Sequence, residues 1–268
     1  MSNLSFALRD SATMLRRDFR HSLRYPAMSL SGLGVPIIML VLFDYVFGGA
    51  IGAGLGSVTH IGSYIDYLAP GIIIMAVGSG CATTAINLCM DMSEGIIARF
   101  RTMAIFRASV LTGQVLGSLI RTMITVVLVF GVALLMGFRS DANPVAWIAA
   151  LGLIALITLA VTWMGVAFGL VGKTPAGANS LSLMFQLLAF TSSAFVSPAL
   201  MPPGVRWFAE YQPFTPVIDT LRALLLGTPI SSSTVILAFA WCVGLTLVGY
   251  FWALSVYNRN SVRTNPAR

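Results

Sequence analysis

Three arginines within nine residues, flanked by long apolar stretches, form a group of side chains that could do chemistry. They are Arg99, Arg101 and Arg107 of the stretch RFRTMAIFR (99–107), which contains no acid. A planar guanidinium can hold a carboxylate or a backbone carbonyl through paired hydrogen bonds, so such a group could bind another protein. The arginines could equally be a membrane anchor, because basic residues collect on the cytoplasmic side of membrane proteins. The pattern alone leaves both interpretations open.

The sequence contains no motif typical of catalysis or nucleotide binding. A phosphate-binding loop requires G-x-x-x-x-G-K-[ST], whereas Lys173, the single lysine, follows GLVG without that spacing. His21 and His60 are predicted on opposite sides of a membrane, so we predict no metal site. We also expect no cofactor on this chain and no enzyme activity of its own.

The composition indicates which solvent these side chains meet. Of the 268 residues, 57% are hydrophobic and 9% are charged, whereas about a quarter of a soluble domain is charged. A helix needs about 20 mostly apolar residues to cross a membrane, and the chain has several such stretches. The pattern predicts an all-α integral membrane protein with six spans, at about 28–48, 67–90, 117–137, 145–171, 178–199 and 233–256.

The basic residues predict the orientation of these spans. The formal net charge is +7, but the clustered basic stripe with aromatics that is typical of a nucleic-acid surface is missing. With a cytoplasmic N-terminus, most basic residues lie in inner segments, and only Arg139, Arg206 and Arg222 lie in outer ones. We therefore predict a multi-pass plasma-membrane protein with both termini in the cytoplasm.

The N-terminal segment has the pattern of an interfacial helix. Within residues 3–20, leucines and Phe19 line one helical face and Arg9, Arg16 and Arg20 the adjoining one. Such a helix lies in the membrane plane with its arginines toward anionic headgroups. A solvated basic tail is the alternative.

The connection before the last predicted span is too apolar for a simple outer loop. In SPALMPPGVRWFAEYQPFTPVIDTLRALLLGTP (197–229), prolines divide the chain into two short helices, predicted at about 203–211 and 215–226. A re-entrant pair dipping into the outer leaflet fits this pattern, since backbone at that depth must be covered by protein. Two helices lying flat on the outer surface are the alternative.

A few polar groups fall within predicted spans. Asp44, near the outer end of the first span, could face a cavity, pair with Arg206 or Arg222, or lie at the interface. Asn87 and Gln186 could form hydrogen bonds between helices or contact a ligand.

Two further features of the spans concern helix packing and depth. Arg121 lies about one turn inside the third span, and we expect it to extend toward the cytoplasmic headgroups. Gly165 and Gly169 form a pair of small residues four positions apart, which predicts a close helix–helix contact.

Taken in order, the N-terminal helix, the six spans and three further stretches resemble one transporter family. The stretches are EGIIARFRTMAIFRASVLTGQVLGSLIR (94–121), GFR (137–139) and MPPGVRWFAEYQPFTPVIDTLRALLLG (201–227). They resemble the ABC-transporter permeases of the type-2 exporter family, particularly those of the daunorubicin-resistance kind.

The resemblance implies one permease domain over 27–258. A connecting helix (1–26) precedes this domain and a cytoplasmic tail (259–268) follows it. Within it, the resemblance implies a cytoplasmic coupling loop at 91–109 and an outer re-entrant segment at 201–227.

The coupling loop of this family sits in a cleft of a separate ATPase subunit. Carried over here, the coupling residues are Glu94, Gly95, Phe100, Arg101 and Arg107. The connecting helix carries Arg9, Arg16 and Arg20. Two positions depart from the family pattern, because Ala104 stands where a proline is usual and Gln212–Pro213 where Asn–Pro is usual.

The function implied is ATP-driven export of an amphipathic drug, antibiotic or lipid. ATP and Mg would bind the partner ATPase subunit, and a second permease copy, identical or related, would complete the path. The first, second and fifth spans would line this path. Its candidate residues are Phe43, Asp44, Tyr45, Asn87, Met184, Phe185, Gln186 and Phe190.

Two other functions remain open at the level of the sequence. The same family could export a lipid-linked polysaccharide. A secondary transporter driven by an ion gradient would instead need ionisable groups near the midplane and internally repeated halves. Asp44 is the single buried acid candidate, and no repeat is evident.

Overall fold

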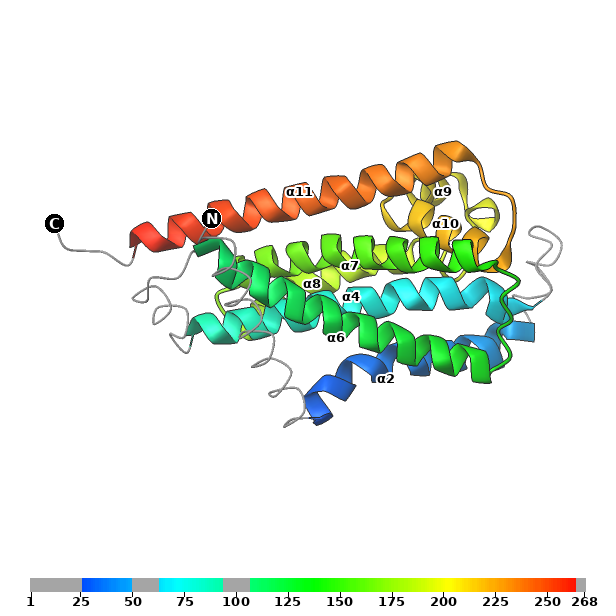
Figure 1. The fold of residues 1–268 in the computed structure, drawn as a ribbon, viewed down its shortest axis with the longest axis horizontal. Helices are drawn as coiled ribbons and strands as arrows, with labels where there is room; N and C mark the ends of the chain where they lie inside the picture. The colour runs from blue at the N-terminus through cyan, green and yellow to red at the C-terminus, as the bar shows by residue number, and fades with distance from the viewer. Residues whose placement is uncertain (1–25, 50–62, 94–106, 264–268) are drawn as a thin grey trace.

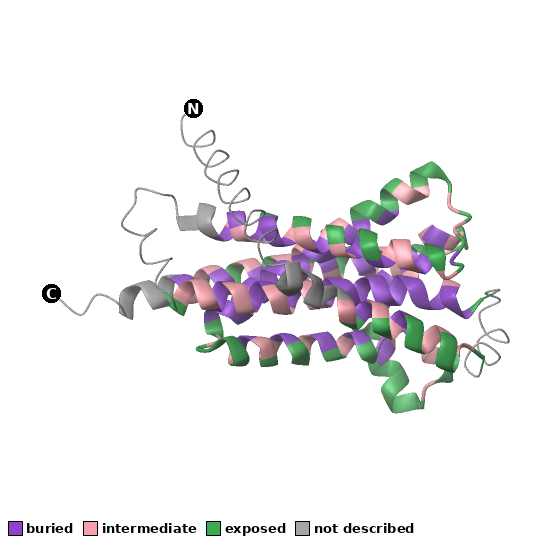
Figure 2. Cartoon of the chain, turned by 90° about the horizontal axis from the view of Figure 1, so that it is seen from below, coloured by how far each residue is buried: buried purple, intermediate pink, exposed green. Residues whose placement is uncertain are grey.

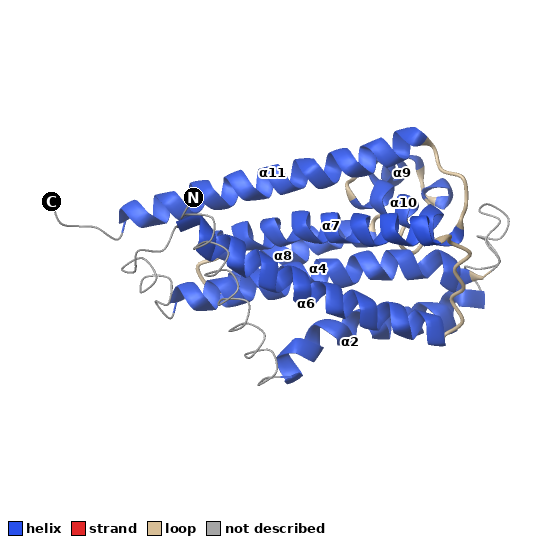
Figure 3. Ribbon diagram, in the orientation of Figure 1, coloured by secondary structure: helices blue, strands red, loops and turns tan. Residues whose placement is uncertain are grey.

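The computed structural model describes residues 26–49, 63–93 and 107–263, and the regular structure of these ranges is helical (Figure 3). The predicted all-α class is therefore confirmed for this part of the chain. The first elements are α2 (Pro26–Leu42), a π-helix η1 (Phe43–Phe47), α4 (Tyr64–Ser93), α6 (Arg107–Leu135) and α7 (Pro144–Val171). The remaining elements are α8 (Pro175–Phe190), a 3-10 turn η2 (Pro198–Leu200), α9 (Pro203–Tyr211), α10 (Phe214–Leu226) and α11 (Ser232–Arg263).

Four helices in the described ranges are long and apolar enough to cross a membrane. They are Tyr64–Ser93, Leu111–Leu135, Pro144–Val171 and Ser232–Tyr257, with a shorter apolar helix at Gly34–Phe47. The second, third, fourth and sixth predicted spans are thus found as helices. A count of six spans stays a prediction, since α8 has only 16 residues.

The long helices run side by side, with α9 and α10 gathered at one end of the bundle (Figure 1). Helix α4 packs against α2, α6, α7, α8 and α10, and most of its buried residues belong to the main apolar core. Figure 2 shows this buried region running along the interior of the bundle. Because α4 meets so many elements, groups placed on its faces can contact most of the other helices.

Glycines bring α7 close to α4. A Cβ atom on Gly165 would lie 2.8 Å from the carbonyl oxygen of Cys81, and one on Gly169 would lie 2.7 Å from that of Ala85. These distances are shorter than a side chain allows, so the predicted close contact at this glycine pair is confirmed. On the other side of α7, Gly249 of α11 brings its backbone equally close to Met164.

Polar caps with a following proline define where α7 and α8 begin. The Asn143 side-chain oxygen accepts from the backbone N–H of Ala146 at 2.7 Å, and the Thr174 hydroxyl accepts from that of Gly177 at 3.1 Å. Each cap is followed by a proline at the first helical position, where the missing N–H leaves no hydrogen bond unmade.

Helix α8 is shorter than the predicted fifth span of 178–199, because it ends at Phe190. The hydroxyls of Thr191 and Ser192 donate to the carbonyl oxygens of Leu188 and Ala189, which closes the last turn. The chain then stays largely non-helical as far as 197, and Ser192 to Phe195 are buried. The two short helices predicted at 203–211 and 215–226 are confirmed as α9 and α10.

Candidate functional site

The predicted ATPase-facing residues fall mostly outside the part of the chain that the structure describes. Glu94, Gly95, Phe100 and Arg101 lie in the range 94–106, and Arg9, Arg16 and Arg20 lie before residue 26. Arg107 is the first residue of α6. Their roles in coupling therefore stay predictions.

Aromatic path candidates converge at the end of α2 and α8. Phe43 of η1 packs on Phe195 with ring centroids 4.3 Å apart, and Phe190 stacks on the same ring at 5.5 Å. Tyr45 is on the same π-helix and is 76% exposed. The structure thus joins the first and fifth predicted spans through Phe195, a residue that the sequence analysis did not single out.

Asp44 lies beside this aromatic group and is half-buried. Neither of its two predicted partners, Arg206 and Arg222, forms its ion pair with Asp44. Arg206 pairs with Glu210 at 2.7 Å, and Arg222 pairs with Asp219 at 2.7 Å. Of the alternatives for Asp44, the pairing with these arginines is wrong, because each already has an acid on its own helix.

The three consecutive candidates of α8 face different surroundings. Met184 is 71% exposed. Phe185 lies between Phe168 and Phe214, with ring centroids 5.9 and 5.5 Å away. Gln186 is buried against α4, where a Cβ on Gly78 would lie 3.2 Å from its Cγ.

Asn87 lies apart from the other candidate residues of the substrate path. It is half-buried on α4, nine residues beyond Gly78 and so about 13 Å along the helix axis from the contact with Gln186. Of the eight path candidates, the structure joins Phe43 and Phe190 through Phe195 and separates Asn87 from both.

A buried arginine at the junction of α4, α8 and α10 is the main polar feature that sequence reasoning missed. Arg222 of α10 is 8% exposed. Its guanidinium donates to the carbonyl oxygen of Tyr67 from Nε at 3.2 Å and from Nη2 at 3.1 Å, and Nη2 also donates to that of Ser193 at 2.7 Å. Desolvation of a charge is costly unless it is paired and hydrogen-bonded, and here it is both.

Acceptors from three chain segments complete this arginine site. Arg222 donates from Nη1 to Asp219 Oδ1 at 2.7 Å, and the Ser193 hydroxyl donates to the same oxygen at 2.7 Å. The backbone N–H of Ser193 donates to the Thr215 hydroxyl at 3.2 Å. The network fixes the segment after α8 between α10 and the first turns of α4. The i, i+3 spacing of Asp219 and Arg222 was the sequence signal for it.

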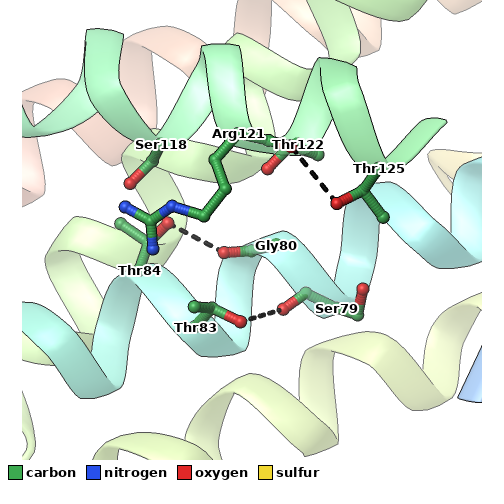
Figure 4. A pocket seen from close by; sticks show the side chains of 8 residues that line it. All are labelled: Ser79, Gly80, Thr83, Thr84, Ser118, Arg121, Thr122 and Thr125. Atoms are coloured by element: carbon green, nitrogen blue, oxygen red, sulfur yellow. Dashed lines mark hydrogen bonds between the residues drawn. The ribbon is translucent and has the colours of Figure 1, made fainter. Parts of the chain in front are cut away.

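A second polar site lies in a small pocket between α4 and α6 (Figure 4). Its lining includes six hydroxyl side chains, one glycine and one arginine. The lining residues are Ser79, Gly80, Thr83, Thr84, Ser118, Arg121, Thr122 and Thr125. Arg121 lines this pocket beside Gly80 of α4, and Figure 4 shows its side chain extending along α6 toward Ser118. Its predicted extension toward the cytoplasmic headgroups stays a prediction.

Comparison with known proteins finds one matching family and several similar proteins. The family described as ABC-2 type transporter matches residues 10–226. The daunorubicin resistance ABC transporter permease protein DrrB1 of Streptomyces coeruleorubidus is 28% identical over 231 residues, which cover 85% of this chain and 75% of that protein. The inner membrane transport permease YadH of Escherichia coli K12 is 24% identical over 209 residues, or 76% of this chain and 79% of that protein.

Proposed function

The chain belongs to the ABC-2 type transporter family, and from that premise we propose that it is the membrane-spanning permease subunit of an ATP-driven exporter. Its cargo is an amphipathic drug, antibiotic or lipid, which it moves outward across the plasma membrane. The family match over 10–226 is the observation that carries this proposal. Similarity to a permease named for daunorubicin resistance supports the class of cargo.

The energy for transport comes from a separate chain. An ATPase subunit, carrying ATP and Mg, docks on the cytoplasmic loop 91–109 through Glu94, Gly95, Phe100, Arg101 and Arg107. The connecting helix (1–26), with Arg9, Arg16 and Arg20, lies along the inner membrane surface. Closure of the ATPase subunits moves the loops and changes the tilt of the spans.

The proposed topology has six crossings over 27–258, both termini in the cytoplasm and a cytoplasmic tail at 259–268. The four long apolar helices supply four crossings. The apolar helix α2 with η1, and the 16-residue helix α8, supply the other two. Helices α9 and α10, within 201–227, form the outer re-entrant pair.

Substrate passes between two permease copies along α2, α4 and α8. The exposure of Tyr45 and Met184 on neighbouring elements supports this path, since their side chains are free to meet a second copy or a substrate. The joined rings of Phe43, Phe190 and Phe195 provide an apolar wall between these two elements. An uncharged wall suits an amphipathic cargo.

The test is purification of the tagged permease from its native membrane in a mild detergent. We expect an ATPase subunit to copurify, and we expect Glu94→Ala and Arg101→Ala to release it. Arg139→Ala is the matched control, because Arg139 is an exposed arginine in a predicted outer segment. If the chain purifies alone and transports without ATP, the exporter assignment is wrong.

A further inference from the structure

The pocket between α4 and α6, here called the hydroxyl pocket, is small. Its volume is about 20 Å³, whereas a cavity needs about 10–15 Å³ to hold one water molecule. Its lining residues lie in Tyr64–Ser93 and Leu111–Leu135, two of the helices that are long and apolar enough to cross a membrane. The pocket therefore has room for one water molecule or one monatomic ion within the helix bundle.

Helices α4 and α6 meet most closely at Gly80. A Cβ atom there would overlap the side chain of Thr122, so this residue of α6 lies opposite Gly80 of α4. The two helices run in opposite directions (Figure 1), and residues four apart lie on one helical face. Four residues on from Gly80 and four residues back from Thr122 therefore bring Thr84 opposite Ser118. Both side chains line the hydroxyl pocket (Figure 4).

Thr84 provides the pocket with an acceptor but no donor. Its hydroxyl donates to the carbonyl oxygen of Gly80 at 2.8 Å, so its proton is used and lone pairs of its oxygen remain. The residue is 1% exposed, so bulk water does not reach this oxygen. Thr83 and Thr125 also donate to carbonyl oxygens of their own helices, at 3.1 and 3.2 Å.

Ser118 provides the pocket with an unused donor. It is 2% exposed, and its Oγ has no hydrogen-bond partner among the described residues. Buried polar groups in proteins are nearly always hydrogen-bonded. Ser118 thus faces Thr84 across the pocket without a direct hydrogen bond, and a polar pair at such a separation is commonly bridged by water.

The chemistry of the lining favours water over an ion. The lining contains Arg121 and neither aspartate nor glutamate, so a cation would lie beside a positive charge. Arg121 already interacts with another group, so it needs no anion in the pocket to balance it. Water both accepts and donates hydrogen bonds, and Ser118 and Thr84 provide one partner for each.

We infer that one ordered water molecule occupies the hydroxyl pocket and bridges α6 to α4. It accepts a hydrogen bond from the Ser118 hydroxyl and donates one to Thr84 Oγ1. Because α4 ends at Ser93 and α6 begins at Arg107, the bridge joins the two helices between which residues 94–106 run. The contact of α4 with α6 is therefore hydrated, whereas its glycine contact with α7 is direct. This inference does not depend on the export proposal.

The direct test is a structure of the full-length permease in a lipid nanodisc, at a resolution that shows ordered water. We expect one peak of density within hydrogen-bond distance of both Ser118 Oγ and Thr84 Oγ1. A pocket without density would overturn the inference. A hydrogen bond from Ser118 straight to Thr84, or to a carbonyl oxygen of α6, would overturn it as well.

A double-mutant cycle tests the bridge by equilibrium unfolding in detergent. Ser118→Ala removes the donor, and Thr84→Val removes the acceptor with little change of shape. We expect Ser118→Ala to lower the folding equilibrium constant about threefold to tenfold in the wild type, but to have little further effect in the Thr84→Val background. Thr84→Ser keeps the acceptor, so Ser118→Ala should regain its full effect in that background.

Thr158→Val is the matched control for this cycle. Thr158 is a buried threonine of α7 whose hydroxyl also donates to the carbonyl oxygen four residues before it, at 2.6 Å, and it does not line the pocket. The effects of Ser118→Ala and Thr158→Val should multiply. If Ser118→Ala keeps its full effect beside Thr84→Val, or is reduced equally beside Thr158→Val, the bridge between Ser118 and Thr84 is ruled out.

Discussion

Arg222 lies over the ring of Tyr67, 3.7 Å from its centroid, and donates two hydrogen bonds to the carbonyl oxygen of the same residue. One side chain of α10 is thereby held to both the ring and the backbone of α4. The further bond from Arg222 to the Ser193 carbonyl includes the segment after α8. Three parts of the chain far apart in sequence depend on a single guanidinium.

Removal of this guanidinium should strongly destabilise the fold. Arg222→Leu removes the guanidinium's hydrogen bonds to the carbonyl oxygens of Tyr67 and Ser193 and leaves Asp219 without its charged partner, so we expect the free energy of unfolding to fall by about 3–5 kcal/mol. Denaturation in detergent measures this change. The control is Arg206→Leu, at an exposed i, i+4 pair, which should cost about 0–1 kcal/mol. Equal losses for both variants would show that the network does not stabilise the protein.

A side chain at the α4–α7 contact should separate the two helices. Gly165→Val places a branched side chain where even a Cβ atom lies 2.8 Å from the Cys81 carbonyl oxygen, and we expect a loss of stability of at least about 1–3 kcal/mol. Gly152→Val on the same helix is the matched control, because no atom lies within 4 Å of its Cβ position. Thermal unfolding should separate the two variants. A smaller effect at Gly165 than at Gly152 would contradict the close contact.

The cap of α7 should depend on a side-chain oxygen at position 143. Asn143→Ala removes the acceptor of the Ala146 N–H and should cost about 1 kcal/mol, whereas Asn143→Asp keeps the acceptor and should cost less. Unfolding midpoints in detergent would rank the two variants. Identical midpoints would mean that Pro144 alone is sufficient to begin the helix.

Cysteine labelling should reveal which side of the membrane each loop faces. The native Cys81, Cys89 and Cys242 are buried free thiols, so a membrane-impermeant maleimide should leave folded wild-type protein unlabelled. Asp141→Cys, at an exposed position before α7, should be labelled in intact cells, and Lys173→Cys, at an exposed position after α7, only after permeabilisation. The opposite pattern would invert the proposed orientation.

The long helices could be predicted from the sequence because apolar runs of about 20 residues or more leave few alternatives in a membrane. The division into α9 and α10 was predictable too, since prolines limit where helices begin. The end of α8 was not predictable. The apolar pattern continues past Phe190, whereas Ser193 is held by hydrogen bonds to Thr215, Asp219 and Arg222, which come from another part of the chain.

The partners of the charged residues could not be predicted from the sequence either. Sidedness alone made Arg206 and Arg222 candidates for Asp44, but each pairs with an acid on its own helix. The pocket that Arg121 lines could likewise not be predicted, because it depends on the packing of α6 against Gly80 of α4.

Helix α8 is shorter than the thickness of a bilayer's hydrocarbon core. Sixteen residues cover about 24 Å, less than a hydrocarbon core of about 30 Å. The buried residues Ser192 to Phe195 continue the chain beyond the helix, but Leu183 and Leu187 of α8 are exposed. In the proposed six-span topology, acyl chains beside these leucines would meet a short apolar surface. Such hydrophobic mismatch thins the bilayer locally at a modest free-energy cost for each ångström. Phospholipids with shorter acyl chains would relieve this cost, so lipid composition should change the stability of α8 without any change in the chain itself.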